Sequence, residues 1–126
     1  MEKTVAIAAL AALAHESRLD VFRLLVQTGR DGLAAGLIAE RLNLAAATLS
    51  FHLSHLKHAG LITARRNGRS LSYVAEYDAM AALLGYLTEN CCQGDAAACG
   101  VGACDPSTIV PERKRHEASA RARVRR

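Results

Sequence analysis

The sequence predicts a mainly α-helical domain with one small β-hairpin. Three observations support this: alanine and leucine dominate, apolar residues recur at helical spacing along much of the chain, and Asn67-Gly68 separates two short alternating segments. Hydrophobic residues make up 51% of the 126 positions and charged residues 22%, so the chain has enough apolar material for a core and is not a disordered protein. No apolar run reaches the roughly 18 residues that a membrane span needs, and we expect no membrane partner.

Five helices are expected from the apolar periodicity and the positions of glycine and asparagine: 3–14, 16–28, 33–42, 45–59 and 79 to about 91. Asn43-Leu44 is predicted to form a tight turn, and Gly60 is predicted to end the fourth helix in a left-handed conformation. Asp78 is the expected N-cap of the fifth helix.

A hairpin is predicted between the fourth and fifth helices. Leu61 to Arg66 and Arg69 to Glu76 alternate, and the turn between them, Asn67-Gly68, is expected to place both of its residues at positive φ. This order of elements describes a winged helix-turn-helix domain, in which a short helix and a longer one pack together and leave the outer face of the second free.

The fourth helix carries the main functional prediction. A rotation of about 100° per residue places Leu49, Leu53 and Leu56 on one face, which we expect to be buried. The other faces are rich in hydrogen-bond donors and lack acidic residues, which suits phosphates and base edges in a major groove. The predicted DNA contacts are Thr48, Ser50, Phe51, His52, Ser54, His55 and Lys57 in this helix, and Arg65, Arg66 and Arg69 in the hairpin. A merely solvated face is the alternative, but solvated hairpins usually mix charges of both signs.

The net charge of +4 is unevenly distributed. Residues 111–126 hold seven basic and two acidic residues, which leaves nine basic and ten acidic residues in the rest of the chain. Within that nearly neutral body, residues 45–75 contain four basic residues and no acidic one. A local basic cluster of this kind attracts phosphate, so the position of the charge supports DNA binding where the overall charge does not.

Three segments resemble the ArsR/SmtB family of metal-responsive repressors: Leu13 to Leu19 (LAHESRL), Leu44 to Leu56 (LAAATLSFHLSHL), and Ala59 to Ile62 with the hairpin turn Arg66 to Arg69. The resemblance covers about residues 5 to 92. It implies a homodimer whose first and last helices form the interface, bound to palindromic operator DNA until a ligand releases it. Residues 45–47 are all alanine where many relatives carry Ser or Gln. This leaves Asn43 as a substitute cap and thymine methyl groups as targets for base recognition.

Four cysteines lie close together after the fifth helix: Cys91, Cys92, Cys99 and Cys104. The first three thiolates can converge if the chain leaves the helix there. A three-sulfur site suits trivalent arsenic (arsenite) or antimony (antimonite), because the lone pair leaves a pyramid with three bonds. The arsenic-responsive branch of the family looks similar, with Thr88 to Cys92 at the end of the last helix. Cys104 is either a fourth thiol nearby or a bystander, and no organic cofactor is expected.

The sequence leaves other roles open for these cysteines: an unliganded tail of small residues, a zinc site that uses all four, or a thiol redox switch. A thiol-dependent enzyme is less favoured, because the cysteines follow a helix C-terminus, whose dipole raises thiol pKa values. His52, His55 and His58 cannot converge on one metal from a single helix, and His15 is expected to be a cap or a packing residue.

Three regions are expected along the chain. They are a DNA-binding and dimerisation domain over 1–92, a cysteine-containing loop over 93–110, and a basic, disordered tail over 111–126. The first 14 residues resemble a short secretory signal, but Glu2 offsets the charge of Lys3, and the apolar residues fall at a helical spacing that continues to Val26. A cytoplasmic location is therefore predicted. In that compartment the cysteines stay reduced.

Overall fold

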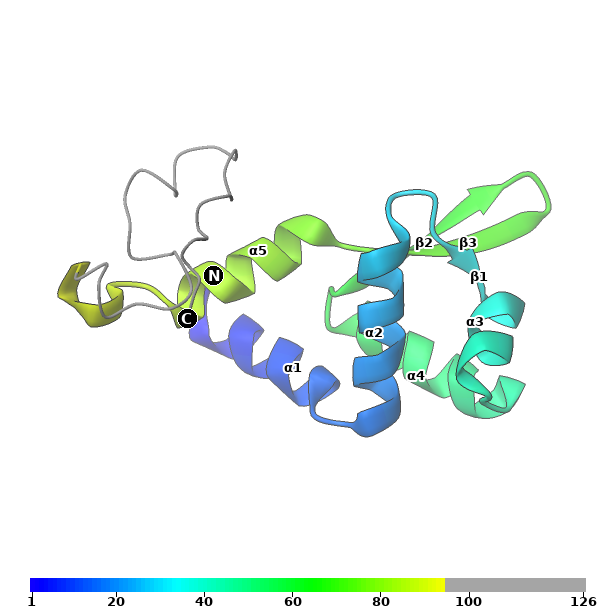
Figure 1. The fold of residues 1–126 in the computed structure, drawn as a ribbon, viewed down its shortest axis with the longest axis horizontal. Helices are drawn as coiled ribbons and strands as arrows, with labels where there is room; N and C mark the ends of the chain where they lie inside the picture. The colour runs from blue at the N-terminus through cyan, green and yellow to red at the C-terminus, as the bar shows by residue number, and fades with distance from the viewer. Residues whose placement is uncertain (95–126) are drawn as a thin grey trace. The chain divides into compact units, whose positions relative to one another are not determined.

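The computed structural model describes residues 1–94 and is mainly helical, with one small antiparallel sheet (Figure 1). The elements are α1 (Lys3–Leu13), α2 (Glu16–Thr28), β1 (Leu33–Ala34), α3 (Ala35–Leu42), α4 (Ala46–His58), β2 (Ile62–Asn67), β3 (Ser70–Ala75), α5 (Tyr77–Leu87) and the short 3-10 segment η1 (Cys91–Gly94). The mainly helical fold with a small sheet is confirmed. Met1–Leu83 form one compact unit, and Leu84 begins a second. Cys99, Cys104 and the basic tail lie outside the described residues.

Helices α1 and α2 are joined by a sharp corner that Arg18 and His15 stabilise. The buried Arg18 side chain donates from Nε to the carbonyl oxygen of Ala12 at 2.6 Å, which satisfies one of the last carbonyls of α1. His15 caps α2, because its Nδ1 accepts a hydrogen bond from the backbone N–H of Ser17 at 3.1 Å. The expectation that His15 is a cap or packing residue is confirmed.

The sheet has three strands in the order β1-β3-β2, all antiparallel. Strand β1 was not expected, because Leu33 and Ala34 were assigned to the third helix, which instead begins at Ala35. Its pairing with Tyr73 and Ser72 joins residues far apart in sequence, and local periodicity cannot show such a partner. Gly32, at φ 73°, precedes the strand, and a Cβ there would lie 2.5 Å from the carbonyl oxygen of Tyr73.

The hairpin turn lies one residue later than predicted. Asn67 pairs with Ser70 at the end of the ladder, so the two turn residues are Gly68 and Arg69. Gly68 has φ 63°, whereas Asn67 stays in the strand outside the left-handed region. A positive φ at the first turn residue alone is the pattern of a type II′ turn, so Asn67 needs no positive φ. Gly60 has φ 81° after α4, as predicted.

Helix α5 begins earlier and ends earlier than predicted. It starts at Tyr77, so Asp78 lies in its first turn and does not cap it. The Tyr77 hydroxyl donates to the carbonyl oxygen of Val26 at 2.9 Å, which connects the start of α5 to the end of α2. The helix stops at Leu87 and not near Cys91. There the Thr88 hydroxyl bonds back to the Leu84 carbonyl at 2.7 Å, and Asn90 adopts φ 58°.

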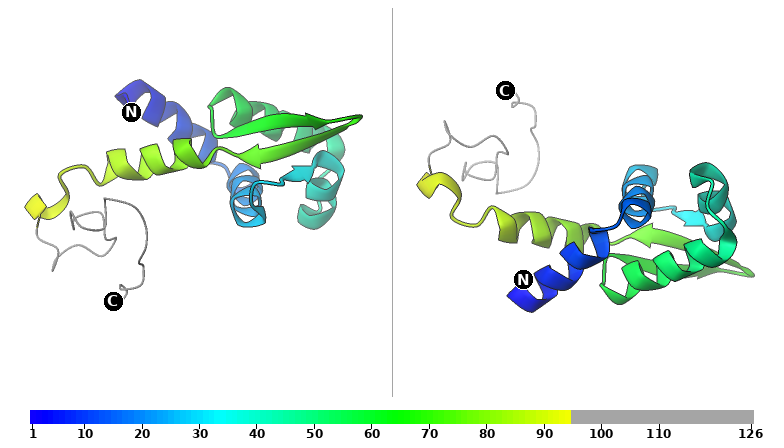
Figure 2. Two further views of the ribbon diagram at one scale, coloured as in Figure 1. Left: turned by 90° about the horizontal axis from the view of Figure 1, so that it is seen from above. Right: turned by 90° about the horizontal axis from the view of Figure 1, so that it is seen from below.

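The core lies where α2, α3 and α4 meet the sheet. Its most completely buried large side chains are Val21, Leu25, Ile38, Leu49, Leu56, Leu61 and Ile62. Figure 2 shows the β2–β3 hairpin extending outward past the helices, with its turn at the far end. In the described part of the chain, no helix is both long and apolar enough to cross a membrane.

Candidate functional site

Helix α4 follows α3 through a tight turn that Asn43 makes possible. Asn43 ends α3 at φ 55° and ψ 50°, and the N–H of Leu44 bonds to the Ala39 carbonyl at 3.0 Å. Asn43 is therefore a C-cap of α3 and not the substitute N-cap expected for α4. The residue at the N-cap of α4 is Ala45, whose side chain makes no capping hydrogen bond.

The predicted division of α4 into a buried and an exposed face is confirmed. Leu49, Leu53 and Leu56 are buried against the rest of the unit. Six of the seven predicted DNA-contacting residues of this helix are exposed: Thr48, Ser50, Phe51, Ser54, His55 and Lys57. The helix therefore presents hydroxyl, imidazole and ammonium groups to solvent, together with one aromatic ring.

His52 is the exception, and its assignment to the DNA-facing surface was wrong. Only 5% of this residue is exposed, because His15 of α2 covers it with ring centroids 4.7 Å apart. A helical wheel places position 52 on the flank of α4, and only the tertiary contact with α2 decides that it is buried.

The surroundings of the His52 side chain disfavour its protonated form. Burial and the charges of His15, Arg18 and His55 lower the pKa of His52 below its ordinary value. Its Nδ1 atom is buried and has no hydrogen-bond partner among the described residues. The imidazole therefore acts as a packing group between α2 and α4, with a polar atom that packing alone does not satisfy.

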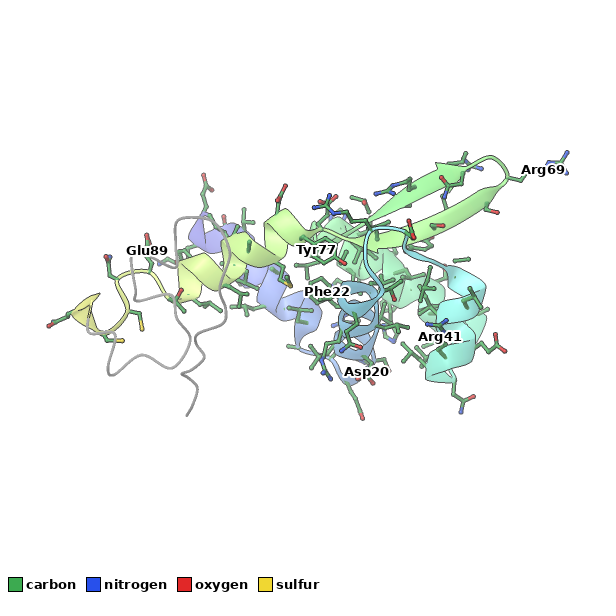
Figure 3. All side chains as sticks on the ribbon, turned by 45° about the horizontal axis from the view of Figure 1, so that its top comes forward. Asp20, Phe22, Arg41, Arg69, Tyr77 and Glu89 are labelled. Carbon is green, nitrogen blue, oxygen red and sulfur yellow. The ribbon has the colours of Figure 1, made fainter. Side chains whose placement is uncertain are left out.

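The three hairpin arginines are all exposed, but they do not share one face. Arg65 and Arg66 are consecutive on β2, so their side chains leave opposite faces of the hairpin. Arg65 donates to the carbonyl oxygen of Arg30 at 3.1 Å, which brings a fourth arginine, Arg30, beside the hairpin. Arg69 lies in the turn, and Figure 3 shows its guanidinium at the tip, directed away from the sheet.

Sequence reasoning missed the contributions of Arg30 and His15 to this surface. Arg30 follows α2 in a loop, and its approach to Arg65 spans 35 residues of chain. His15 lies still farther in sequence from the helix that it covers. No periodic or motif signal connects such distant positions, so only the folded chain shows both contacts.

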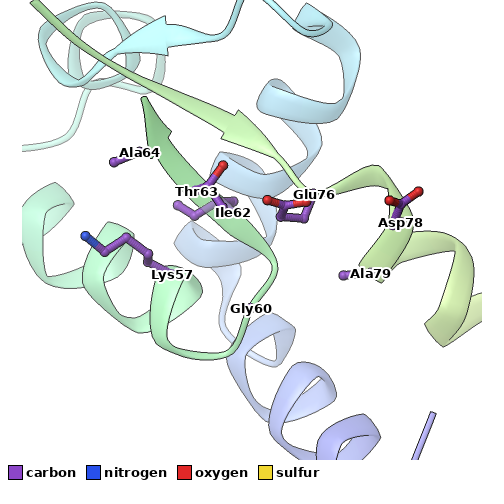
Figure 4. Close-up of a pocket in the computed structure, with 8 residues that line it drawn as sticks. All are labelled: Lys57, Gly60, Ile62, Thr63, Ala64, Glu76, Asp78 and Ala79. Carbon is purple, nitrogen blue, oxygen red and sulfur yellow. The ribbon is translucent and has the colours of Figure 1, made fainter. Parts of the chain in front are cut away.

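An open depression of about 590 Å³ lies where the end of α4, strand β2 and the start of α5 meet (Figure 4). Its charged lining consists of Lys57, Glu76 and Asp78. One ammonium beside two carboxylates gives the depression no strong preference for an anion, and its open shape would not bury a small ligand.

The cysteine pair lies beyond α5 in a left-handed stretch of backbone. Cys92 and Gln93 have φ values of 48° and 53°, so the chain has left the α-helix, as a shared ion requires. The Sγ atoms of Cys91 and Cys92 lie 3.0 Å apart. The described residues contain no cluster of three or more potential metal ligands, and the third predicted ligand, Cys99, lies outside them.

Comparison with known sequences places the chain among transcriptional regulators. A family model described as a helix-turn-helix domain matches residues 13–65. The transcriptional activator HlyU of Vibrio cholerae is 30% identical over 97 residues, which cover 75% of this chain and 87% of HlyU. The nodulation protein NolR of Rhizobium meliloti is 32% identical over 80 residues, or 64% of this chain; the chain spans 63% of the length of NolR.

Comparison with solved structures gives the same fold. An ArsR-like transcriptional regulator from Rhodococcus sp. RHA1 matches with a TM-score of 0.64 over 75% of this chain and 87% of its own; at 24% identity it shows the fold alone. The homodimeric winged helix-turn-helix domain Mb0332 from Mycobacterium bovis, described as a possible ArsR-family regulator, is 30% identical, with a TM-score of 0.55 over 69% and 81%. A possible transcriptional regulator for arsenical resistance is 26% identical, with a TM-score of 0.55 over 63% and 79%.

Proposed function

This chain belongs to the ArsR family of winged helix-turn-helix transcriptional regulators, and on that premise we propose that it binds double-stranded operator DNA as a homodimer. The observation that carries the proposal is the outer face of α4 with the hairpin beside it. Four exposed basic residues, Lys57, Arg65, Arg66 and Arg69, lie in a stretch without any acidic residue. Such a surface complements a phosphate backbone on both sides of a major groove.

The homodimer is supported by the exposed side chains of α1. This helix buries only alanines, whereas Val5, Ile7 and Leu10 are 48%, 56% and 42% exposed. Ile7 and Leu10 lie about 60° apart around the helix and share one exposed face, whereas Val5 lies on another side. Neighbouring large aliphatic side chains left in solvent mark an interaction site. The homodimeric state of the Mycobacterium bovis neighbour supports a second copy of this chain as the partner. Leu84 and Leu87 of α5 are exposed as well and fit the same role.

The effector we propose is trivalent arsenic, bound by Cys91, Cys92 and Cys99, with antimonite as a second ligand of the same chemistry. The 3.0 Å separation of the first two sulfur atoms fits two thiolates that share one thiophilic centre. Zinc fits less well, because structural zinc sites take four ligands, usually in pairs spaced two to four residues apart. The arsenical-resistance neighbour supports the same effector.

Release of DNA would follow from reordering of the chain around the thiols. If the deprotonated thiols of Cys91, Cys92 and Cys99 shared one arsenic centre, Cys99 would be brought toward the segment after α5, and α5 is one of the two elements proposed to form the dimer interface. If the DNA-bound dimer fits the unliganded arrangement better, effector and operator oppose each other, typically by about 1–3 kcal/mol and equally in both directions. A cytoplasmic location is part of the proposal, because it keeps the thiols reduced.

The test is a DNA-release titration with the full chain. Arsenite should weaken operator binding by a factor of about 5 to 150. Cys91→Ser and Cys92→Ser should keep the operator affinity but lose the response, and Cys104→Ser is the matched control. Release of DNA by zinc but not by arsenite would identify zinc as the effector. Release by an oxidant that dithiothreitol reverses, without a response to arsenite, would identify a thiol redox switch. Release of Cys91→Ser at the wild-type arsenite concentration would overturn the thiol site.

A further inference from the structure

Phe51 is the most exposed of the large apolar side chains in the described part of the chain, at 65%. It lies in the middle of α4. Its ring contacts are with His52 at 5.9 Å and His55 at 6.2 Å, both in the same helix. An aromatic ring so exposed, on a helix face that is otherwise polar and free of acidic residues, is available to a partner outside the domain.

The neighbours of Phe51 on the helix surface define what that partner could be. Ala47 and His55 lie about 40° to either side of it, and Thr48 and Ser54 about 60°. From Ala46 to His58 the helix contains no Asn, Gln, Arg, Asp or Glu. Apart from Lys57, near the C-terminal end of the helix, α4 therefore lacks the side chains that usually identify guanine or adenine.

The geometry points to one chemical feature of the major groove, and we propose that Phe51 recognises the C5-methyl group of a thymine in each operator half-site. The inference rests on the proposed operator binding and deepens it. The thymine methyl is the apolar group that a base pair presents in the major groove, and aromatic and alanine side chains are suited to contact it. Ala47, about 40° away on the helix surface, leaves room beside the ring and adds apolar surface.

One neighbour of the ring is a packed side chain. His52 is buried, and His15 packs against it with ring centroids 4.7 Å apart. The Phe51 ring lies 5.9 Å from this buried imidazole and 6.2 Å from the exposed His55.

A second copy of this chain is the competing partner for Phe51. The charge around the ring argues against it, because the hydroxyl, imidazole and ammonium groups of α4 and the nearby arginines match a polyanion. Helix α1 differs in this respect, because its exposed Val5, Ile7 and Leu10 lie among alanines and not among hydrogen-bond donors.

The experiment begins with selection of preferred sequences from random duplex DNA by the full chain. An A·T pair is expected at one position in each half-site. Replacing that thymine with deoxyuridine removes the methyl group and keeps the base pairing. The wild-type Kd should rise roughly fourfold per half-site, the factor that one buried methyl group carries. Phe51→Ala should bind the thymine and deoxyuridine duplexes equally, whereas Lys57→Ala should weaken both and keep the ratio between them.

Each outcome decides a different point. A wild-type protein that selects a sequence but binds thymine and deoxyuridine duplexes alike overturns the role of Phe51 and leaves the proposed function standing. A protein that selects no DNA overturns the proposed function and this inference together. A change of oligomeric state in Phe51→Ala, measured by light scattering, would assign the ring to a protein interface instead. Thermal unfolding of Phe51→Ala should match the wild type, because the side chain is exposed.

Discussion

Helices α1 and α4 bury opposite kinds of residue, although both pack against α2. Helix α1 buries Ala6, Ala9 and Ala12 and leaves its large aliphatic side chains in solvent. Helix α4 buries its leucines and exposes small polar residues and histidines. The first arrangement brings α1 close to its neighbours through small side chains and leaves apolar area to be covered elsewhere. In the second arrangement, the large apolar side chains of α4 are buried within the same chain, and the exposed face is suited to a polar partner.

The comparison teaches that apolar periodicity identifies a helix but not the direction in which its apolar face points. Ile7 and Leu10 recur at helical spacing, as core residues do, yet both are more than two fifths exposed. In α1, the small size of the residues on the other face decides which face is buried. Alanines spaced three apart allow a close helix contact, so the larger residues of α1 remain outside.

The largest expected effect is on the buried face of α4. Leu56 is completely buried, so Leu56→Ala should lower the free energy of unfolding by about 2–5 kcal/mol, through lost burial and the cavity left behind. Ser54→Ala, on the exposed face of the same helix, should change it by no more than about 0.5 kcal/mol. Urea unfolding at one fixed protein concentration measures both. Equal costs would show that the two faces of α4 are not as different as described.

The next effect tests the exposed face of α1. Ile7→Glu places a carboxylate beside Leu10 on the exposed face of α1 and should prevent dimerisation. Operator affinity should then fall about a hundredfold or more, because each half-site is bound alone. Sedimentation and a DNA-binding titration measure the two changes. Gln27→Glu adds the same charge at an exposed position of α2 and should leave the dimer intact; a dimeric Ile7→Glu protein would remove α1 from the interface.

A smaller effect is expected from the hairpin. Arg69→Ala and Arg66→Ala should each reduce the slope of log affinity against log salt concentration by about 1, because each removes one phosphate contact. The loss should be similar for operator and unrelated DNA. Arg23→Ala, an exposed arginine of α2 outside the proposed interface, is the matched control. A loss confined to the operator would mean that these arginines read bases.

The smallest effect concerns His52 at the junction of α2 and α4. Folding lowers the pKa of this imidazole, so the folded protein takes up the proton at a lower pH than an unfolded histidine, which does so as the pH falls through about 6.5. The unfolded state then binds more protons, so the free energy of unfolding should decrease below that pH. His52→Leu should flatten this decrease in thermal unfolding between pH 7.5 and 5.5. His58→Gln, on the exposed face, controls for the loss of a histidine, and an unchanged slope in His52→Leu would contradict the assignment.

Local signals in the sequence predicted most of the fold. Helix α2 runs from Glu16 to Thr28 as expected, and Gly60 adopts the left-handed conformation that its position required. The errors arose where a distant contact decides the outcome. Strand β1 exists only because β3 pairs with it, and His52 is buried only because His15 covers it.

The candidate site was predictable to the same extent. The outer face of α4 follows from its helical period, so five polar positions and Phe51 were assigned correctly to the exposed surface. The opposite directions of Arg65 and Arg66 follow from strand alternation once the strand is known. The contact of Arg65 with the Arg30 carbonyl does not, since it joins the hairpin to the loop after α2. Whether three thiols meet depends on Cys99, so that assignment stays a prediction.

The tight approach at Gly32 limits how this domain can change over evolutionary time. Any side chain there would press on the Tyr73 carbonyl and on Val74, in a backbone conformation that other residues rarely adopt. A substitution at this position would displace strand β3, and the hairpin would no longer be aligned with α4 for the proposed DNA binding. Gly36, four residues later in α3, meets nothing within 4 Å and is open to replacement. Two glycines four residues apart thus differ greatly in how well they would tolerate a side chain.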